Sequence, residues 1–327
     1  MLPRGLVIHR QWKRLLKKAT GVFSLAFLCV VAVYTHAHAS EFETSLGPQF
    51  GYLSGHTTYH ISSYSGSSGV ESELEFPLRA ALGGLKLTAR DEKMTLELGL
   101  MTNLTSGSGK LKDSDWLTND LDIQETGQAH PGKDIYSESA IDLRALIFEG
   151  SLKAKAYTIG PVVLLPRVGG AIQYFEFSAY DTEQVGYGPY ASLYTVSVSG
   201  KTIDYNVTYF FFYLGPEFEV NSEGLGLSAG VYFCPYVYAT DRDDHLLRYK
   251  LSEAETDGTG YMAALSLYWT SQRGPEVSLK ASYIKLDTDG TQTQTFYDGP
   301  YQGQTFSVDD TIKTEQWTGL LSVLWRF

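Results

Sequence analysis

Long apolar segments are nearly absent from this sequence. The one sustained apolar run, residues 21–33, is shorter than the roughly 20 residues that a membrane-spanning helix needs. No later run reaches that length. We therefore do not expect the chain to cross a membrane with helices.

Cysteine and histidine are scarce as well. The chain has two cysteines, and only Cys234 lies after residue 39, so a chain that loses its N-terminal segment cannot form an intramolecular disulfide. Histidine is the side chain that ordinarily titrates near neutral pH. Four histidines follow residue 39, so candidates for acid–base chemistry are few: His56, His60, His130 and His245.

The first 39 residues have the composition of a cleavable signal peptide. They begin with six basic and no acidic residues, continue into the apolar run and end in Ala37-His38-Ala39, a small-x-small cleavage signal before Ser40. We predict a signal peptide over residues 1–39 and a mature domain over residues 40–327.

Basic residues are in the minority after the predicted cleavage site. Six of the 26 basic residues and none of the 37 acidic ones are removed, which leaves a net charge of about −17 on the mature domain. Such a charge argues against nucleic acid as a partner and favours cationic peptides or proteins, which the field would attract.

The mature domain instead has the pattern of antiparallel strands. The full chain holds 23 tyrosines, 16 phenylalanines and 32 glycines, and apolar and polar residues alternate with a period of two over residues 94–104, 261–269 and 277–283. In lipid, only helices and closed barrels satisfy every backbone group. Export without a spanning helix therefore indicates an all-β, transmembrane outer-membrane barrel in contact with outer-membrane lipid.

The connections predict ten antiparallel strands. Short polar turns fall near residues 89–93, 156–161, 221–225 and 271–275, and longer polar stretches fall near residues 56–70, 105–137, 181–202, 241–257 and 287–309. Outer-membrane barrels have short periplasmic turns and long extracellular loops. The last strand ends in an aromatic residue, Phe327. A soluble periplasmic β-sandwich is the alternative, but long strands and unequal loops disfavour it.

Asp243 and His245 are the first candidates for chemistry. Residues two apart in an extended chain share a face, so the Asp243 carboxylate can fix the His245 tautomer and leave the other ring nitrogen as a general base. Counting by twos from Val231 and Phe233 on the lipid side places both residues outward. A bulge between about Tyr236 and Asp241 is therefore expected, because one extra residue reverses the face.

Asp113 and Asp115 form a second candidate pair. Counting by twos from Glu97 turns both inward if the third strand is unbroken. Two adjacent carboxylates do not both ionise easily, so we expect one of the two pKa values to be raised. A singly protonated pair can hold water and stabilise an oxyanion. On its own, an Asp-x-Asp sequence in a loop is usually a solvated turn.

Together these motifs resemble the omptins, a family of ten-stranded outer-membrane endoproteases. Asp113-Ser114-Asp115-Trp116 and Asp243-Asp244-His245 match the family's motifs in residue type, order and strand position. The resemblance implies an aspartic-type, omptin-like endopeptidase whose active site faces the cell exterior. It implies that Asp243 and His245 activate water, that Asp113 and Asp115 lie across the cleft, and that neither a metal, a cofactor nor a protein nucleophile is needed.

The chain departs from the family at two places. The first-strand acid that helps bind a basic substrate side chain aligns with Tyr59, while its partner is retained as Asp241. A pocket with one carboxylate should prefer basic residues less strictly. The basic residues that hold lipopolysaccharide phosphates are replaced as well, so we expect weaker dependence on that lipid; the residues at these positions are Ile172, Tyr174, Glu176 and Thr208.

Three other functions compete with proteolysis. A non-catalytic barrel of the same fold could serve as an adhesin or as structure, and the lost lipid-binding bases favour it. A lipid hydrolase would need a serine near His245, and no G-x-S-x-G motif accompanies that residue. A general porin is disfavoured because ten strands leave a narrow lumen. We expect polar strand residues at His56 and His60. We expect solvated loop charges at Asp309 and Asp310, and an inert thiol at Cys234.

Overall fold

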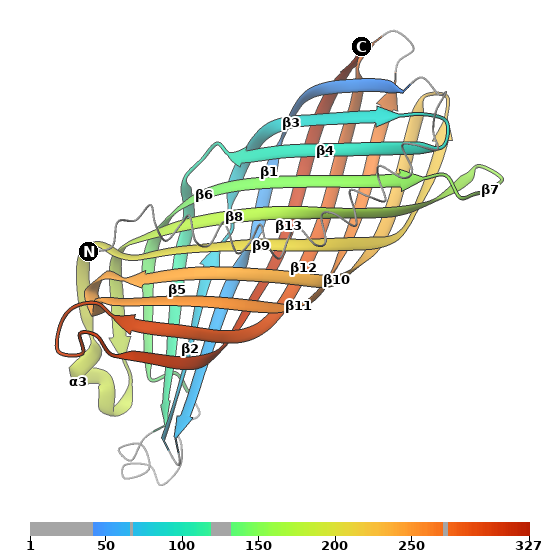
Figure 1. Ribbon diagram of the computed structural model, residues 1–327. Helices are drawn as coiled ribbons and strands as arrows, with labels where there is room; N and C mark the ends of the chain where they lie inside the picture. Colours follow the sequence, from blue (N-terminus) through green and yellow to red (C-terminus); the bar gives the residue numbers. More distant parts are fainter. Residues whose placement is uncertain (1–41, 66–67, 119–131, 271–273) are drawn as a thin grey trace. The chain divides into compact units, whose positions relative to one another are not determined.

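The fold was examined in a computed structural model, which describes residues 42–65, 68–118, 132–270 and 274–327. Nearly every element from Glu43 onward is a strand, and neighbouring strands are antiparallel (Figure 1). The strands are β1 (Glu43–Ser65), β2 (Ser68–Pro77), β3 (Ala80–Arg90), β4 (Met94–Asn103), β5 (Gly107–Thr118), β6 (Ile135–Ala154), β7 (Tyr157–Ile159), β8 (Val162–Gly186), β9 (Val196–Ser222), β10 (Leu225–His245), β11 (Lys250–Thr270), β12 (Glu276–Phe296) and β13 (Thr305–Arg326).

These strands close into a ring of ten segments that run along the barrel wall. We call each segment a stave, and a stave consists of one long strand or of two consecutive shorter ones. The last strand, β13, pairs with β1, and β1 pairs on its other edge with both β2 and β3. β2 and β3 are two halves of one stave, as are β4 and β5, while β7 forms a small hairpin with the start of β8. The predicted ten-stranded antiparallel barrel is confirmed. The predicted signal peptide, residues 1–39, lies outside the described residues.

The two ends of the barrel differ in their connections. One end, which we call the turn end, carries the C-terminus and short turns such as Glu223–Gly224, where both residues have positive φ (48° and 85°), as tight hairpin turns require. The opposite end, the loop end, carries three short helical segments: η1 (Gly188–Tyr190), α3 (Ala191–Tyr194) and η2 (Leu246–Arg248). Among the described residues, no helix is long and apolar enough to cross a membrane.

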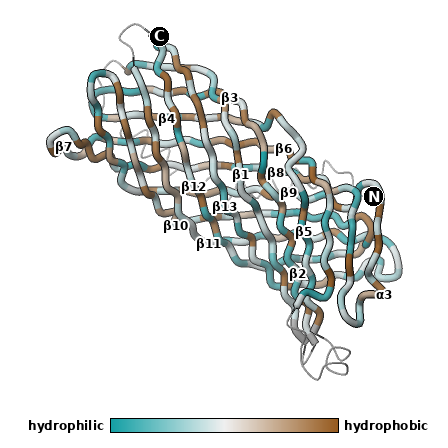
Figure 2. The backbone as a smooth tube through the Cα atoms, turned by 180° about the vertical axis from the view of Figure 1, so that it is seen from behind, coloured by the Kyte–Doolittle hydropathy of each residue, from teal (hydrophilic) through white to brown (hydrophobic). Residues whose placement is uncertain are grey.

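The polar stretches expected as loops are mostly strand. β10 continues to His245 and β11 begins at Lys250, so residues 241–257 are a narrow hairpin, and β12 and β13 extend through most of residues 287–309. The reason is the change of solvent along each strand. Near the turn end the outward side chains are apolar, for example Phe50, Val231 and Leu321. Beyond them the residues that are not buried are mostly polar, for example Thr58, Arg242 and Glu255, so the alternation that reveals a strand disappears from the sequence. Figure 2 colours each residue along the strands by its hydropathy.

Side chains fill the barrel interior. Below the loop end, an aromatic layer has almost no exposure, and its rings contact one another: Phe76 stacks on Tyr205 at a centroid distance of 4.2 Å and lies 5.0 Å from Phe177. Tyr209 and Tyr213 continue the layer along β9 toward the turn end. This packing is not that of an open channel, and it disfavours the porin alternative.

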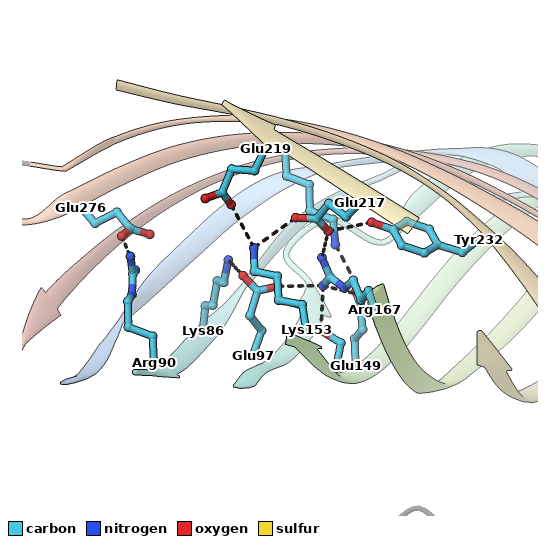
Figure 3. Close-up of polar contacts among 12 residues, drawn as sticks. Lys86, Arg90, Glu97, Glu149, Lys153, Arg167, Glu217, Glu219, Tyr232 and Glu276 are labelled. Carbon is cyan, nitrogen blue, oxygen red and sulfur yellow. Dashed lines mark hydrogen bonds and ion pairs between the residues drawn. The ribbon is translucent and has the colours of Figure 1, made fainter. Parts of the chain in front are cut away.

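Ion pairs occupy the interior nearer the turn end. The Arg167 guanidinium lies 2.8 Å from Glu217 and 2.7 Å from Glu97, and Lys153 lies 3.1 Å from Glu217 (Figure 3). Lys86 also reaches Glu97. These pairs border a cavity of about 300 Å³. Burying charge is tolerable here because each ion has a partner of opposite sign.

Candidate active site

A bulge in β10 turns the predicted catalytic residues into the barrel. The pairing of β10 slips between Phe233 and Tyr236 against β9 and between Cys234 and Val237 against β11. Val231 and Phe233 are exposed, whereas Val237 is buried. The expected reversal of face is confirmed, but it falls at Pro235, slightly before the predicted interval. Proline has no N–H to donate to the ladder, which explains why the irregularity lies there.

Asp243 and His245 form a close buried pair at the loop end. Nε2 of His245 lies 2.7 Å from Oδ2 of Asp243, and the two side chains are 7% and 0% exposed respectively. This distance is that of a charge-assisted hydrogen bond. With Nε2–H donated to the carboxylate, the remaining lone pair of the imidazole is on Nδ1.

Tyr59 takes part in this pair rather than standing apart from it. Its hydroxyl donates to Oδ2 of Asp243, the same oxygen that faces His245, and lies 3.4 Å from Nε2 of His245. The ring packs 5.3 Å from Tyr205 within the aromatic layer. The alignment of Tyr59 with the family's substrate-binding position predicts that it helps bind substrate, and this stays a prediction; the contacts place its hydroxyl against Asp243.

Asp113 and Asp115 both point inward from β5. They are buried, and the charges of Asp113 and Asp243 act on one another. The third stave is not the unbroken strand that was assumed: it is interrupted at residues 104–106, and β5 slips by one residue between Gly107 and Gly109. The two irregularities together preserve the inward orientation. The four predicted catalytic residues therefore share the interior of the loop end.

The pKa values of the pair in β10 suit a general base. Burial lowers the pKa of His245 below its ordinary value, although the Asp243 carboxylate acts in the opposite direction. Burial would raise the pKa of Asp243, but attraction to His245 and the hydrogen bonds from His245 and Tyr59 outweigh it and hold that pKa below its usual value. At neutral pH the imidazole is therefore neutral and the carboxylate ionised.

The pair in β5 behaves as the sequence predicted. Burial and the neighbouring charge of Asp115 raise the pKa of Asp113 to about 7, against the opposing effect of Arg248. One carboxyl of the pair therefore holds a proton readily near neutral pH. A protonated carboxyl can donate a hydrogen bond, which an ionised one cannot.

A further carboxylate, Asp310, was expected as a solvated loop charge, and that expectation is wrong. Asp310 lies inside β13 and is 2% exposed, whereas Asp309 faces outward and is exposed. Its charge raises the pKa of Asp241, after the larger effect of burial. The structure thus gives Asp241 a neighbouring carboxylate, and the less strict preference for basic residues stays a prediction. Alternation along residues 309–315 was the available signal, but the polar outward face hid it.

The remaining expectations fall outside this site. His60 faces outward and lies 3.7 Å from Glu71, and Cys234 is buried in the barrel. Among the described residues, no cluster of His, Cys, Asp or Glu is arranged to hold a metal. Tyr174 contacts Glu176 at 3.3 Å, and weaker dependence on lipopolysaccharide stays a prediction.

The closed ring, its apolar outer belt and the polar interior of the loop end define an outer-membrane β-barrel. The Omptin family model matches residues 43–318, and the chain belongs to that family. A search of curated protein sequences gives no match.

One of the matching solved structures supports the fold. The outer membrane protease OmpT from Escherichia coli is 13% identical, with a TM-score of 0.66 over 88% of this chain and 99% of that one. The translocator domain of the autotransporter NalP from Neisseria meningitidis is 10% identical and covers 95% of this chain and 98% of that one, with a TM-score of 0.37. OprG from Pseudomonas aeruginosa is 9% identical and covers 88% and 97%, with a TM-score of 0.34.

Proposed function

We propose that this protein is an outer-membrane endopeptidase that hydrolyses peptide bonds with water activated by Asp243 and His245. The observation that carries the proposal is the 2.7 Å contact between Nε2 of His245 and Oδ2 of Asp243, in the interior of the loop end where Asp113 and Asp115 are also buried. Membership of the omptins supports it.

His245 acts as the general base in this mechanism. Asp243 accepts Nε2–H and fixes the tautomer, and Nδ1 takes a proton from the attacking water. Water then adds to the carbonyl carbon of the substrate. Because no side chain is the nucleophile, no acyl-enzyme forms, and the proton on His245 passes to the leaving amine.

Asp113 acts on the substrate carbonyl, and Asp115 acts on the attacking water. When Asp113 carries the proton, its hydroxyl donates to the carbonyl oxygen, whose negative charge grows as water adds. Asp115 remains as an acceptor that orients the water. The raised pKa of Asp113 makes this state accessible near neutral pH.

The location and substrates follow from the charge and the fold. The proposed signal peptide, residues 1–39, directs export, and the loop end with its active site faces the cell exterior. The acidic mature domain attracts cationic peptides or proteins. Asp241, with Asp310 beside it, and the ring of Tyr59 border the space in which a substrate side chain is held.

The test is cleavage of a mixed peptide library by the refolded barrel. Wild type should cleave, and Asp243→Asn and His245→Ala should each lose on the order of 100- to 10,000-fold in rate, as is typical for a positioned base. Unboiled electrophoretic migration, which reports a closed barrel, should be unchanged. Equal rates for wild type and His245→Ala would refute the proposal.

A further inference from the structure

Lys250 is an inward-facing cation beside the candidate active site. It is the first residue of β11 and the direct register partner of His245 across the β10–β11 hairpin. Directly opposed residues of an antiparallel pair point to the same face, with Cβ atoms about 5 Å apart. Lys250 is only 7% exposed, so its side chain enters the same interior as the imidazole.

Within the part of the chain that the structure describes, the ammonium group of Lys250 has no ion-pair partner. Buried lysines are ordinarily paired with a carboxylate. Among the described residues, no carboxylate oxygen lies within 4.0 Å of Nζ of Lys250. The charge nevertheless acts on Asp243 and, more weakly, on Asp113 and Asp115. By register and burial the cation therefore faces the same interior as the two catalytic pairs, and no described carboxylate forms an ion pair with it.

We propose that Lys250 is a catalytic residue that stabilises the oxyanion formed when water adds to the peptide carbonyl. The inference rests on the proposed function. As the oxygen of Nδ1-activated water bonds to the carbonyl carbon, the carbonyl π electrons move to the substrate oxygen. An unpaired ammonium held in a water-poor cleft stabilises that charge more than it would in bulk water.

A purely structural role would predict different behaviour. A lysine that only holds the hairpin would affect the folded barrel, and its loss would act on the binding of uncharged and anionic ligands alike. A cation reserved for the oxyanion leaves ground-state binding almost unchanged, because the peptide carbonyl is neutral until water adds.

The experiment compares Lys250→Met, Lys250→Arg and Lys313→Met. Lys313→Met is the matched control, because Lys313 lies on the outward face of β13, is half exposed and pairs with Asp287 at 3.3 Å. The probes are a cleavable peptide and a phosphinic peptide of the same sequence, whose anionic tetrahedral phosphorus imitates the oxyanion. Turnover is measured with the cleavable peptide. Calorimetry measures the affinity for the phosphinic peptide and, separately, the affinity for its neutral amide parent.

Lys250→Met should lower kcat about 100-fold, as the loss of one oxyanion donor does, with KM nearly unchanged. Its affinity for the phosphinic peptide should fall by a similar factor while affinity for the parent amide holds. Lys250→Arg should recover part of both, and Lys313→Met should match wild type. If wild type binds the phosphinic peptide through Lys250 but cleaves nothing, the anion site stands and the proposed hydrolysis fails. Unchanged phosphinic affinity in Lys250→Met, or no such binding by wild type, overturns the inference.

Discussion

Tyr59 and His245 meet at a single oxygen atom, Oδ2 of Asp243. The hydroxyl of Tyr59 donates to that oxygen from β1, and Nε2 of His245 lies 2.7 Å from it on β10. Strands from opposite sides of the barrel thus fix one carboxylate. Asp243 is held by two donors, and the imidazole has one orientation relative to the cleft.

Removing the Tyr59 hydroxyl should therefore affect catalysis without opening a cavity. We expect Tyr59→Phe to lower kcat/KM on the order of tenfold, because a hydrogen bond to a charged group contributes about 1.5–3 kcal/mol. The acid limb of the pH profile should move to higher pH. Without the hydrogen bond from Tyr59, the Asp243 carboxylate would stabilise the imidazolium of His245 more strongly. Tyr213→Phe is the control: it also removes a hydroxyl bound to a carboxylate, Glu149 at 2.7 Å. Identical pH profiles for Tyr59→Phe and wild type would contradict this role.

The pH dependence of kcat/KM should be bell-shaped. Activity should fall in acid as His245 is protonated, and this fall should lie below the ordinary histidine pKa, because burial lowers the pKa of that residue. It should fall again above about pH 7, where Asp113 loses its proton. Asp113→Asn cannot ionise but keeps N–H donors, so it should be less active than wild type and lack the alkaline limb. An alkaline limb that persists in Asp113→Asn would assign it to another group.

Asp310 should make the barrel less stable in alkali. Burial raises the pKa of Asp310 to about 7, whereas an unfolded aspartate titrates near 4. The contribution of the protonated Asp310 carboxyl to the stability of the folded barrel is fully present below about pH 4. This contribution is lost as the pH rises through 7. Asp310→Asn should therefore resist urea better at pH 8, by up to about 4 kcal/mol, and equally at pH 3.5. Asp309→Asn, an exposed neighbour, should show no difference at either pH. An equal gain at both pH values would exclude linkage to this carboxyl.

Asp310 should also affect the choice of substrate. Asp241 and Asp310 together can compensate the charge of a guanidinium or ammonium group. Asp310→Asn should reduce the ratio of cleavage beside basic residues to cleavage beside neutral ones by roughly tenfold, the effect of one hydrogen bond to a charged group. Profiling cut sites in a peptide library measures this ratio, with Asp309→Asn as the reference. An unchanged ratio would show that Asp241 acts alone.

Local pattern was enough to predict the barrel and to single out Asp243 and His245 as candidates. Alternation over residues 261–269 and 277–283 reports strands between lipid and a packed interior, and parity along β10 even required the bulge that Pro235 provides. Counting by twos along the third stave predicted the correct face for Asp113, but it assumed an unbroken strand, and that assumption was wrong. Two irregularities at residues 104–109 cancel, and no periodicity reveals such a cancellation.

Asp310 and Lys250 could not be found in this way. Both lie beyond the apolar belt, where inward and outward residues are equally polar, so the sequence does not distinguish a buried charge from a solvated one. Their importance also depends on what lies opposite them. Closure of the ring brings the charge of Asp310 in β13 to bear on Asp241 in β10, and only the hairpin register places Lys250 against His245.

The aromatic layer beneath the dyad gives the site a floor. The interior between the loop end and the cavity bordered by Arg167 is filled by the contacting rings of Phe76, Phe177 and Tyr205. Under the proposed function, a peptide bound beside His245 must then enter and leave through the opening at the loop end. After each cleavage, the two product fragments must leave through the same opening by which the next substrate enters. The rate at which fragments clear that opening becomes part of the rate of the enzyme, and short products should slow it less than long ones.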